Sequence, residues 1–419
     1  MRVLIINRWD DEFSDYGAHI DHHEHSVAYV TVPGHLPRVP AEARSVEVVA
    51  PGADDEELLA AARRCRGALG GVDRVLALSE FNLLLGGRIR DEFGVPGPGV
   101  ADLLRFRDKP LMKETVARAG LRVPRLEVVD SAGAVARFAA TVAGATVLKP
   151  RTGAAAAGVR VIPSGADPAP YLEGADFADL HAEEFVTGTL WHVDGLMRAG
   201  APWFACASRY LGTPLGFASG QPTASVCDDG PDGRRILDFA LRCLDALGLA
   251  DGAFHLEAID APDGPVFLEV GARVGGCLIP WTLAEVHGFD LVREWIRLQM
   301  GQEPAAPGGP AVGGALLVPG TVGARVRRVE DLSGRIPGLY AQVSAEVGKV
   351  LEGEDLVAGF RFRGTDTDAV LEGMARALRE FVFELDAAPV EAVEAERVGA
   401  VRVIAEALEA AAGHADARP

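Results

Sequence analysis

The sequence contains few of the features that mark disulfide-bonded, zinc-binding or membrane-spanning proteins. No C-x-x-C pair and no zinc-site spacing occurs among its five cysteines, which are Cys65, Cys206, Cys227, Cys243 and Cys277. Such isolated cysteines are typical of buried thiols in a reducing compartment. No stretch reaches the roughly 18–20 apolar residues of a membrane-spanning helix. After Arg2 the first apolar run is only "VLII", so no secretory signal is visible. We therefore predict a soluble, cytoplasmic protein.

The sequence also lacks an excess of positive charge. It has 41 Lys and Arg residues against 60 Asp and Glu residues, which gives a net charge of −19. A nucleic-acid backbone is therefore not an expected partner. An enzyme that uses magnesium and a nucleotide stays compatible with this charge, because its cations need only be local. The 419 residues are 48% hydrophobic, which is enough for a large core and predicts two or three domains.

The first hundred residues alternate strand patterns with helix patterns. Strands are predicted at "MRVLIIN", "SVAYVTV", "SVEVVA" and "DRVLALSE", and a helix with an acidic first turn at "DDEELLAAARRCRGAL". This alternation predicts an open parallel sheet over residues 1–100. No G-x-G-x-x-G follows the first strand, which disfavours a dinucleotide-binding Rossmann domain.

Helix and strand patterns continue through the rest of the chain. In "FRDKPLMKETVARAGLRVPR", Asp108 can cap a helix and Gly120 can end it. "TVLKPRTGAAAAGVRVI" indicates two strands joined by a loop of small residues, and "LHAEEFVTGTLWHVDG" indicates a connector that leads into a strand. "QEPAAPGGPAVGG" predicts a linker, after which strands and helices mix. The fold class is therefore α/β (α+β).

Residues 255–276, "HLEAIDAPDGPVFLEVGARVGG", predict a hairpin that brings two carboxylates together. Pro262-Asp263-Gly264 is typical of a three-residue loop whose last residue is left-handed. Such a loop pairs Glu257 with Glu269, Ile259 with Phe267 and Ala261 with Pro265. Because strand side chains alternate, one face should carry His255, Glu257, Phe267, Glu269 and Arg273. The opposite, core face should carry Phe254, Leu256, Val266, Leu268 and Val270.

The predicted pairing of two glutamates needs a physical reason. Directly opposed residues have Cβ atoms about 4.5–5.5 Å apart, and like charges there repel by several kcal/mol at an effective dielectric near 20. Water, a shared proton or a cation can relieve that repulsion, and magnesium is usually held by one or two carboxylates plus phosphates. A solvated hairpin face is the alternative, and the hairpin alone favours it, because most acidic residues lie on the surface.

Other segments supply partners suited to a nucleoside triphosphate. Lys109 and Lys149 can neutralise phosphate oxygens, and the loop with Gly153 and Gly158 can bring backbone N–H groups near them. The connector can read adenine through its backbone and through a Glu183 carboxylate that accepts from the amino group. Magnesium on the opposed glutamates can bridge the phosphates, and Arg273 can stabilise charge on the group being phosphorylated.

The ordered motifs "DK…MK", "LKP…G…G", "EEFV.G…HVDG" and "HLEA…FLEVGAR.GG" resemble the ATP-grasp superfamily over about residues 100–285. The first hundred residues resemble its pre-ATP-grasp domain. The "E-V-G-A-R-x-G-G" ending and the mixed C-terminal region are most similar to carboxylate–amine ligases of the L-amino-acid ligase type. The resemblance implies an ATP-grasp fold with three parts: residues 1–100, residues 101–300 with a small hinged subdomain near 123–186, and residues 301–419.

The resemblance also implies residue roles. Lys109 and Lys149 match ATP-phosphate lysines, Arg273 matches the arginine near the acyl phosphate, and His192 belongs to a strand that faces the nucleotide. The adenine hinge matches Glu183, Glu184, Phe185 and Val186, and the metal ligands match Glu257 and Glu269. The implied cofactors are ATP and Mg²⁺, with Mn²⁺ as the alternative ion. The implied partners are a small-molecule carboxylate and an amine, with no nucleic acid and no membrane. The sequence leaves the oligomeric state open, with a homodimer as one option.

The implied reaction phosphorylates a carboxylate with ATP and couples the acyl phosphate to an amine, which forms an amide or dipeptide and releases ADP and phosphate. A biotin-carboxylase-like enzyme is an alternative, and it needs a separate carrier because no "M-K-M" occurs. A nucleotide-binding module without ligase activity is another. Three departures from the family favour this module. Leu190 stands where the family often has an acidic residue that contacts the ribose, and Gly271 stands where many members have Asn. The loop "RTGAAAAGV" also has alanines, which adopt a positive φ less freely than glycine.

Two further groups of residues invite functional readings. The histidines of "HIDHHEHSVAYV" suggest a metal site but lack any zinc pattern, so we predict a structural role or a place beside the cleft between domains. Candidate substrate-pocket residues, for which a core position is the alternative, are Trp203, Arg209 and Trp281.

Overall fold

The computed structural model describes residues 1–8, 15–154, 156–309, 311–353 and 355–386. Its N-terminal part is a four-stranded parallel sheet in the order β3-β2-β1-β4. The strands are β1 (Arg2–Asn7), β2 (Ser26–Thr31), β3 (Ser45–Val48) and β4 (Arg74–Leu76), and the helices are α1 (Tyr16–His19), α2 (Asp55–Leu69), α3 (Leu83–Phe93) and α4 (Val100–Leu104). The predicted parallel sheet is confirmed.

Helix α2 begins and ends where its sequence predicts. The Asp54 side chain accepts a hydrogen bond from the backbone N–H of Glu57, which satisfies a free donor of the first turn. Acidic residues in that turn also complement the positive end of the helix dipole. The helix ends at Gly70, whose φ of 68° is left-handed. Its buried face packs with α3 on one side of the parallel sheet.

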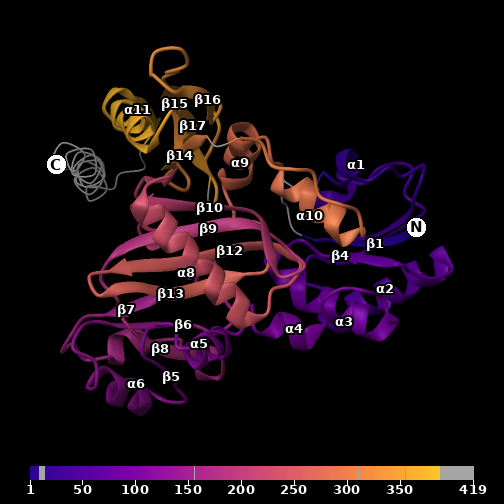
Figure 1. Ribbon diagram of the computed structural model, residues 1–419, viewed down its shortest axis with the longest axis horizontal. Helices are drawn as coiled ribbons and strands as arrows, with labels where there is room; N and C mark the ends of the chain where they lie inside the picture. Colours follow the sequence, from indigo (N-terminus) through magenta and orange to yellow (C-terminus); the bar gives the residue numbers. More distant parts are fainter. Residues whose placement is uncertain (9–14, 155, 310, 354, 387–419) are drawn as a thin grey trace.

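A small antiparallel sheet follows helix α5 (Lys109–Arg118). Its strand order is β5-β8-β6-β7, and helix α6 (Ala132–Ala139) covers it around a core of its own. The strands are β5 (Leu126–Val128), β6 (Thr146–Pro150), β7 (Arg160–Ile162) and β8 (Leu180–Glu184). Figure 1 shows this sheet at one end of the molecule, below the larger central sheet.

The central sheet has eight strands in the order β13-β12-β9-β10-β11-β14-β17-β16. Helices α5 and α8 (Pro231–Leu247) pack on one face of its first strands and share a core with them. The strands are β9 (Thr189–Arg198), β10 (Ala201–Leu211), β11 (Thr223–Cys227), β12 (Gly252–Ala261), β13 (Gly264–Gly271), β14 (Val312–Pro319), β16 (Leu339–Ser344) and β17 (Leu356–Gly364). The sheet thus runs past residue 300, where a domain boundary was predicted.

The C-terminal part adds helix α11 (Thr367–Glu380) and a two-stranded sheet of β15 (Arg325–Val329) and β18 (Phe383–Asp386). These elements pack on β14 and β17 around a core that includes Phe360 and Phe362. The predicted linker ends earlier than its composition suggested, because Val312 already begins β14. The C-terminal elements are therefore built onto the central sheet.

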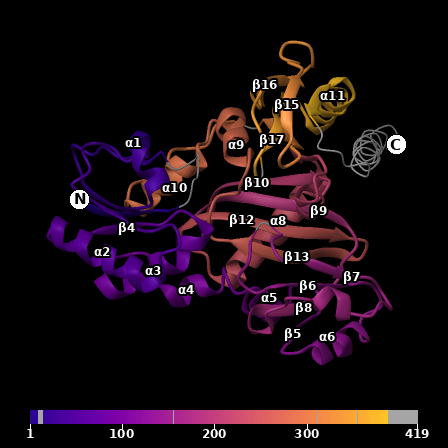
Figure 2. The same ribbon diagram turned by 180° about the vertical axis from the view of Figure 1, so that it is seen from behind.

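Helix α10 (Leu291–Gln299) joins the N-terminal part to the central sheet. Trp295 and Ile296 of α10 lie in one core cluster with Ile5 of β1 and Leu196 of β9. Both ribbon views show α10 beside β1 and β4 (Figures 1 and 2). Fully burying such side chains stabilises by about 1.5–3 kcal/mol each, so this cluster ties the two parts together. None of the helices in the described ranges is long and apolar enough to cross a membrane.

The cysteines are mostly buried, as predicted, with one exception. Cys65, Cys206 and Cys243 are buried and Cys227 is partly exposed, whereas Cys277 is exposed. The prediction of a buried thiol is wrong for Cys277, because this residue lies in the segment between β13 and α9 (Ile279–His287) and has a left-handed φ of 53°.

Candidate active site

The hairpin of β12 and β13 pairs Glu257 with Glu269, as predicted, although by a different route. The loop has two residues rather than three, since Ala261 pairs with Gly264. A register shift between Glu257 and Ala258 then restores the glutamate pairing. The extra residue of this bulge lies on β13 and compensates for the shorter loop.

The bulge also changes which side chains face the core. Phe267 was predicted beside the glutamates, but it is fully buried in the core under α8. Leu268 was predicted in the core and is only partly buried. Both predictions are wrong for the same reason: a bulge inserts one residue into the alternation of the strand. The predicted pairings of Ile259 and Ala261 are wrong as well, because Ile259 pairs with Val266.

Strand β9 places a carboxylate and an imidazole beside the hairpin, next to His255 of β12. His192 lies opposite Glu257, and Asp194 lies opposite His255. One Asp194 oxygen is 2.5 Å from Nδ1 of His192, and the other is 2.8 Å from Nδ1 of His255. Burial by itself raises the pKa of Asp194, but the two histidines outweigh it and hold that pKa below its ordinary value. The sheet face next to the glutamates therefore carries an ionised, fully partnered Asp194.

Two lysines reach the same place from other elements. Lys109 lies at the start of α5, and its Nζ is 3.8 Å from Oε2 of Glu269. Lys149 lies near the end of β6, and its Nζ is 3.6 Å from the same oxygen. Burial by itself lowers the pKa of Lys149, but Glu183 and Glu269 outweigh it, so the ammonium stays charged. The structure thus brings together Lys109, Lys149 and Glu269.

The Glu183 carboxylate lies behind these lysines and is only 2% exposed. One oxygen contacts Lys113 Nζ and lies 2.7 Å from Nε2 of His181, while the other lies 3.2 Å from Nζ of Lys149. We predicted that this carboxylate accepts a hydrogen bond from adenine. The structure instead turns both oxygens toward buried cations, because alternation along β8 places Glu183 on the same face as His181.

Lys113 was missed by the sequence analysis, although two signals pointed to it. It is fully buried on α5, four residues after Lys109 and therefore on the same helix face. The chain has only four lysines, and three of them are Lys109, Lys113 and Lys149. Arginine supplies the cations nearly everywhere else, so this concentration of lysines distinguishes the site.

Acid should weaken the fold through Glu183. Burial by itself raises the pKa of Glu183, but Lys113, Lys149 and His181 outweigh it and hold that pKa well below its ordinary value. The unfolded chain therefore takes up this proton at a higher pH than the folded chain. The stabilisation is complete above the unfolded pKa of about 4.3 and is lost as the pH falls toward the folded pKa.

Urea unfolding of the wild type and of Glu183→Gln between about pH 7 and about pH 3 tests this expectation. The difference in unfolding free energy between the two proteins should shrink as the pH falls below the unfolded value. A difference that stays constant over this range would show that Glu183 is not held ionised by its neighbours.

The connector between β8 and β9 is more exposed than the Glu183 carboxylate. Phe185 is 48% exposed, and its backbone N–H donates to the carbonyl of Ala145 at 2.9 Å. Glu184 Oε1 accepts from the backbone N–H of Arg125 at 3.0 Å. These bonds fix the backbone path that leads to Val186, which is partly exposed.

The loop between β6 and β7 contacts the side chain of Lys109. Nζ of Lys109 lies 2.5 Å from the carbonyl oxygen of Gly153. Gly158 has a left-handed φ of 72°, as its glycine allows, and Ala156 adopts φ of 57° although it has a Cβ. The alanines of this loop therefore do not prevent a turn that needs a positive φ.

Arg273 pairs with a carboxylate that the sequence analysis did not identify. Its Nε lies 2.7 Å from Oε2 of Glu80, which precedes α3 in the N-terminal part. The other Glu80 oxygen contacts Arg107. A Cβ at position 271 would lie 2.8 Å from Oε2 of Glu80, so Gly271 leaves room for this carboxylate. No sequence pattern links residues 80 and 273, because only the fold brings them together.

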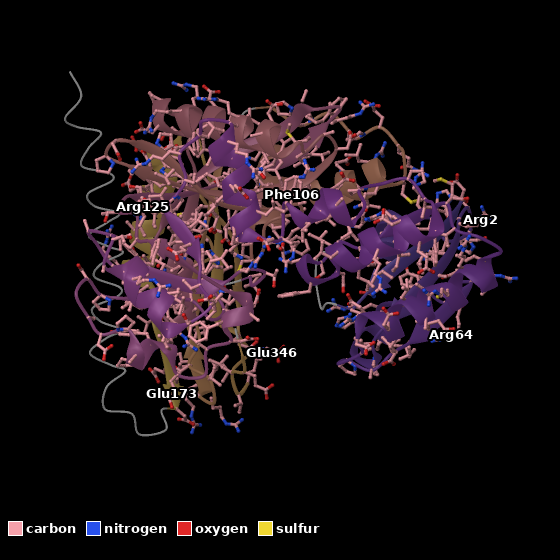
Figure 3. The ribbon with its side chains drawn as sticks, turned by 90° about the horizontal axis from the view of Figure 1, so that it is seen from below. Arg2, Arg64, Phe106, Arg125, Glu173 and Glu346 are labelled. Atoms are coloured by element: carbon pink, nitrogen blue, oxygen red, sulfur yellow. The ribbon has the colours of Figure 1, made fainter. Side chains whose placement is uncertain are left out.

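A narrow cleft is lined by some of these groups, although not by Glu257 or Lys149. It is lined by residues from the N-terminal part, the β6–β7 loop and the hairpin, including Glu80, Phe106, Arg107, Lys109, Gly153, His255, Glu269 and Arg273. Phe106 lies between Arg2, at the N-terminal end of the molecule, and Arg125, beside the small sheet (Figure 3). The cleft is therefore where the parts of the chain meet.

Other candidate residues lie elsewhere or have structural partners. Nε1 of Trp203 donates to the carbonyl of Ala305 at 2.8 Å, and the exposed Trp281 lies beside Arg361. His22 contacts the hydroxyl of Tyr29 at 2.8 Å and stacks on that ring, which fits the structural alternative for the histidine-rich segment.

The donor set of the hairpin suits a hard divalent cation. Glu257 and Glu269 offer carboxylate oxygens, which magnesium and manganese prefer. Their side chains are 13% and 32% exposed, so they are neither sealed off nor fully solvated. Glu269 lies within 4 Å of two lysines, which can meet the phosphates that usually complete a magnesium site. The residues present therefore fit the ion that the sequence implied.

No family model matches the chain. The chain is 28% identical over 225 residues to the uncharacterized protein y4rH of Sinorhizobium fredii, covering 52% of this chain and 46% of that protein. It is 24% identical over 247 residues to L-arginine-specific L-amino acid ligase of Bacillus subtilis, covering 56% of this chain and 60% of the ligase. The chain thus spans roughly half the length of these curated relatives.

Solved structures match nearly the whole chain at low identity. L-amino acid ligase from Bacillus licheniformis superimposes with a TM-score of 0.71 at 15% identity, covering 91% of this chain and 98% of that one. Biotin carboxylase from Campylobacter jejuni gives 0.66 at 13% identity, covering 97% and 95%. The chain therefore has the ATP-grasp fold. L-amino acid ligases occur among its relatives in both sequence and structure, so the predicted resemblance to carboxylate–amine ligases is confirmed.

Proposed function

We propose that this protein is an ATP- and magnesium-dependent ligase that activates a small-molecule carboxylate, with an amino acid as the expected substrate, and couples it to an amine. The opposed Glu257 and Glu269 beside two buried lysines carry this proposal. A pair of opposed acids, of which Glu269 lines a cleft and lies within 4 Å of two lysines, suits a bound metal–phosphate group better than a solvated surface hairpin does.

The first step transfers the γ-phosphoryl group of ATP to the substrate carboxylate. A carboxylate oxygen attacks the γ-phosphorus, the bond to the β-phosphate bridging oxygen breaks, and ADP leaves. Lys109 and Lys149 neutralise phosphate oxygens, and Arg273 stabilises negative charge on the acyl phosphate. When bound, Mg²⁺ held by Glu257 and Glu269 supplies positive charge at the phosphates, and Mn²⁺ suits the same ligands.

The second step forms the amide. The neutral amine attacks the acyl carbon, loses a proton, and the carbon–oxygen bond to the phosphoryl group breaks to release phosphate. Activation is necessary because a carboxylate oxygen is a poor leaving group, whereas phosphate is a good one. Glu80 holds Arg273 at 2.7 Å and so orients the guanidinium in the lining of the cleft.

We assign Glu183 a positioning role in place of direct adenine recognition. Its carboxylate holds Lys149 at 3.2 Å and is itself held by Lys113 and His181. An ammonium group that is already held in place loses less conformational entropy when it contacts a phosphate than a freely moving one does. Adenine would then be read by the backbone of the connector at residues 184–186, while Gly153 and Gly158 allow the loop above the phosphates to close.

An ADP-release assay over a panel of amino acids, offered singly and in pairs, tests the proposed reaction. Release that needs both a carboxylate and an amine supports the ligase. Release that depends on bicarbonate and biotin would assign a carboxylase with a separate carrier. If the protein binds nucleotide but turns over no pair of substrates, it is a nucleotide-binding module without ligase activity.

Lys149→Ala should weaken nucleotide binding while the chain still folds, because Glu183 keeps Lys113 and His181 as partners. Removing the ammonium deletes one phosphate contact and leaves Glu183 and Glu269 repelling an anionic ligand. Charged hydrogen bonds contribute about 1.5–3 kcal/mol, so we expect about 10–100-fold weaker ATP binding in a calorimetric titration. Lys349→Ala is the matched control, because Lys349 is half-exposed and pairs with Asp355. A change confined to heat stability would make Lys149 structural.

A further inference from the structure

Cys206, Cys227 and His287 form a second cluster of metal-ligating side chains. They come from β10, β11 and the last residue of α9. The two sulfur atoms lie 2.7 Å apart, and all three potential ligand atoms lie within 4.8 Å of one another. No residue of this cluster lines the cleft around Glu269.

The fold holds the members of this cluster in fixed positions. Ser208 of β10 pairs with Cys227 of β11, which places Cys206 diagonally across from Cys227 on the same face of the sheet. His287 ends α9, and its carbonyl accepts from the backbone N–H of Gly308 at 2.9 Å. A Cβ at 308 would lie 2.3 Å from that carbonyl oxygen, so only glycine permits this contact.

The surroundings are apolar on one side and open on the other. Phe204 packs edge-on against the His287 ring, with centroids 5.4 Å apart. Cys206 is buried in a core cluster with Leu283 and Phe289. Cys227 and His287 are partly exposed. Two of the three potential ligands are therefore reachable from solvent.

We propose that Cys206, Cys227 and His287 bind a zinc ion, with water as the fourth ligand. Two thiolates and an imidazole are borderline-soft donors that favour zinc, whereas the hard carboxylates of the hairpin favour magnesium. The site is independent of the proposed ligase reaction, because none of its donors lies in the cleft.

Loading the site requires a small local adjustment. With zinc–sulfur bonds of about 2.3 Å in a tetrahedron, two sulfur atoms lie about 3.8 Å apart. The present separation of 2.7 Å must therefore grow by about 1 Å. Cys227 has room to move because it is partly exposed, whereas Cys206 is buried.

The proposed ion would link α9 to the central sheet. Residues 272–278 connect β13 to α9, and they include Arg273. The two cysteine strands are neighbours in the sheet, but His287 reaches them from a separate layer. A zinc ion here would brace the helix that follows the Arg273 segment.

Zinc analysis of the full chain tests the proposal. The protein is purified under oxygen-free, reducing conditions, equilibrated with zinc and passed into metal-free buffer, and its metal content is measured by mass spectrometry. We expect about one zinc per chain, lost in Cys227→Ser and in His287→Ala and kept in Cys277→Ser, whose cysteine is exposed and outside the cluster. Circular dichroism confirms that each variant is folded.

A cobalt titration of the unaltered chain gives a second readout that needs no folded variant. Absorption from thiolate-to-cobalt charge transfer, together with the intense visible bands of a tetrahedral ion, supports the site. Failure to retain zinc, retention that His287→Ala does not change, or a Cys206–Cys227 disulfide in the zinc-treated protein would each overturn it. Ligase activity does not enter either readout.

Discussion

Glu269→Gln should lower turnover by about three orders of magnitude while the protein stays folded. The substitution keeps the size of the side chain and removes the negative charge that faces the predicted ion. A bound metal ion contributes several kcal/mol of transition-state stabilisation, and each 1.36 kcal/mol corresponds to a factor of ten. Glu257→Gln should behave in the same way, because the two residues are directly paired.

The control for this experiment is Glu114→Gln, which makes the same chemical change at an exposed position of α5. It should leave ADP release unchanged. Both hairpin variants should also require more Mg²⁺ for half-maximal activity, which a purely structural role would not produce. Near-normal turnover in either hairpin variant would falsify the metal assignment.

Glu183→Gln should destabilise the fold by about 3–5 kcal/mol, the cost typical of removing one partner from a buried ion pair. The substitution removes the counter-ion that Lys113 and Lys149 share, although burial already lowers the pKa of Lys113 to about 7. Repulsion between the two lysines and the cost of burying them then both lower the free energy of unfolding. Urea unfolding at neutral pH measures the change directly.

The double variant Lys113→Met, Glu183→Leu is the matched comparison, because it replaces the buried pair with apolar side chains. It should recover much of the stability that Glu183→Gln loses, since apolar replacement of a buried ion pair is often neutral. The double variant should still bind ATP more weakly, because Lys149 loses its positioning carboxylate. If Glu183→Gln lowers the free energy of unfolding by less than about 1 kcal/mol, the group of Glu183, Lys113 and Lys149 is solvated.

The sequence predicted the parallel sheet, helix α2, helix α5 and the glutamate pair because each depends on local patterns. Asp108 caps α5 as expected, through a hydrogen bond from the N–H of Leu111 at 3.0 Å. The glutamate pairing was reached through two errors that cancelled, a loop one residue too long and an unrecognised bulge. Bulges leave little trace in the residue pattern, so Phe267 and Leu268 were assigned to the wrong faces.

Contacts between distant segments could not be predicted in this way. Glu80 meets Arg273 only because the N-terminal part packs against the hairpin, and no spacing in the chain encodes that contact. Lys113 is different, since its position four residues after Lys109 and the scarcity of lysine both indicated it. The partners of the Glu183 carboxylate could not be predicted, because they lie on α5 and β6, which the sequence does not show side by side.

The most direct test of the opposed-acid site is a crystal structure with Mg²⁺ and a non-hydrolysable ATP analogue. We expect an ion bound by carboxylate oxygens of both Glu257 and Glu269 and bridging to the phosphates, with Lys109 and Lys149 on phosphate oxygens. An analogue bound elsewhere, or bound here with the ion contacting neither glutamate, would contradict the proposed site.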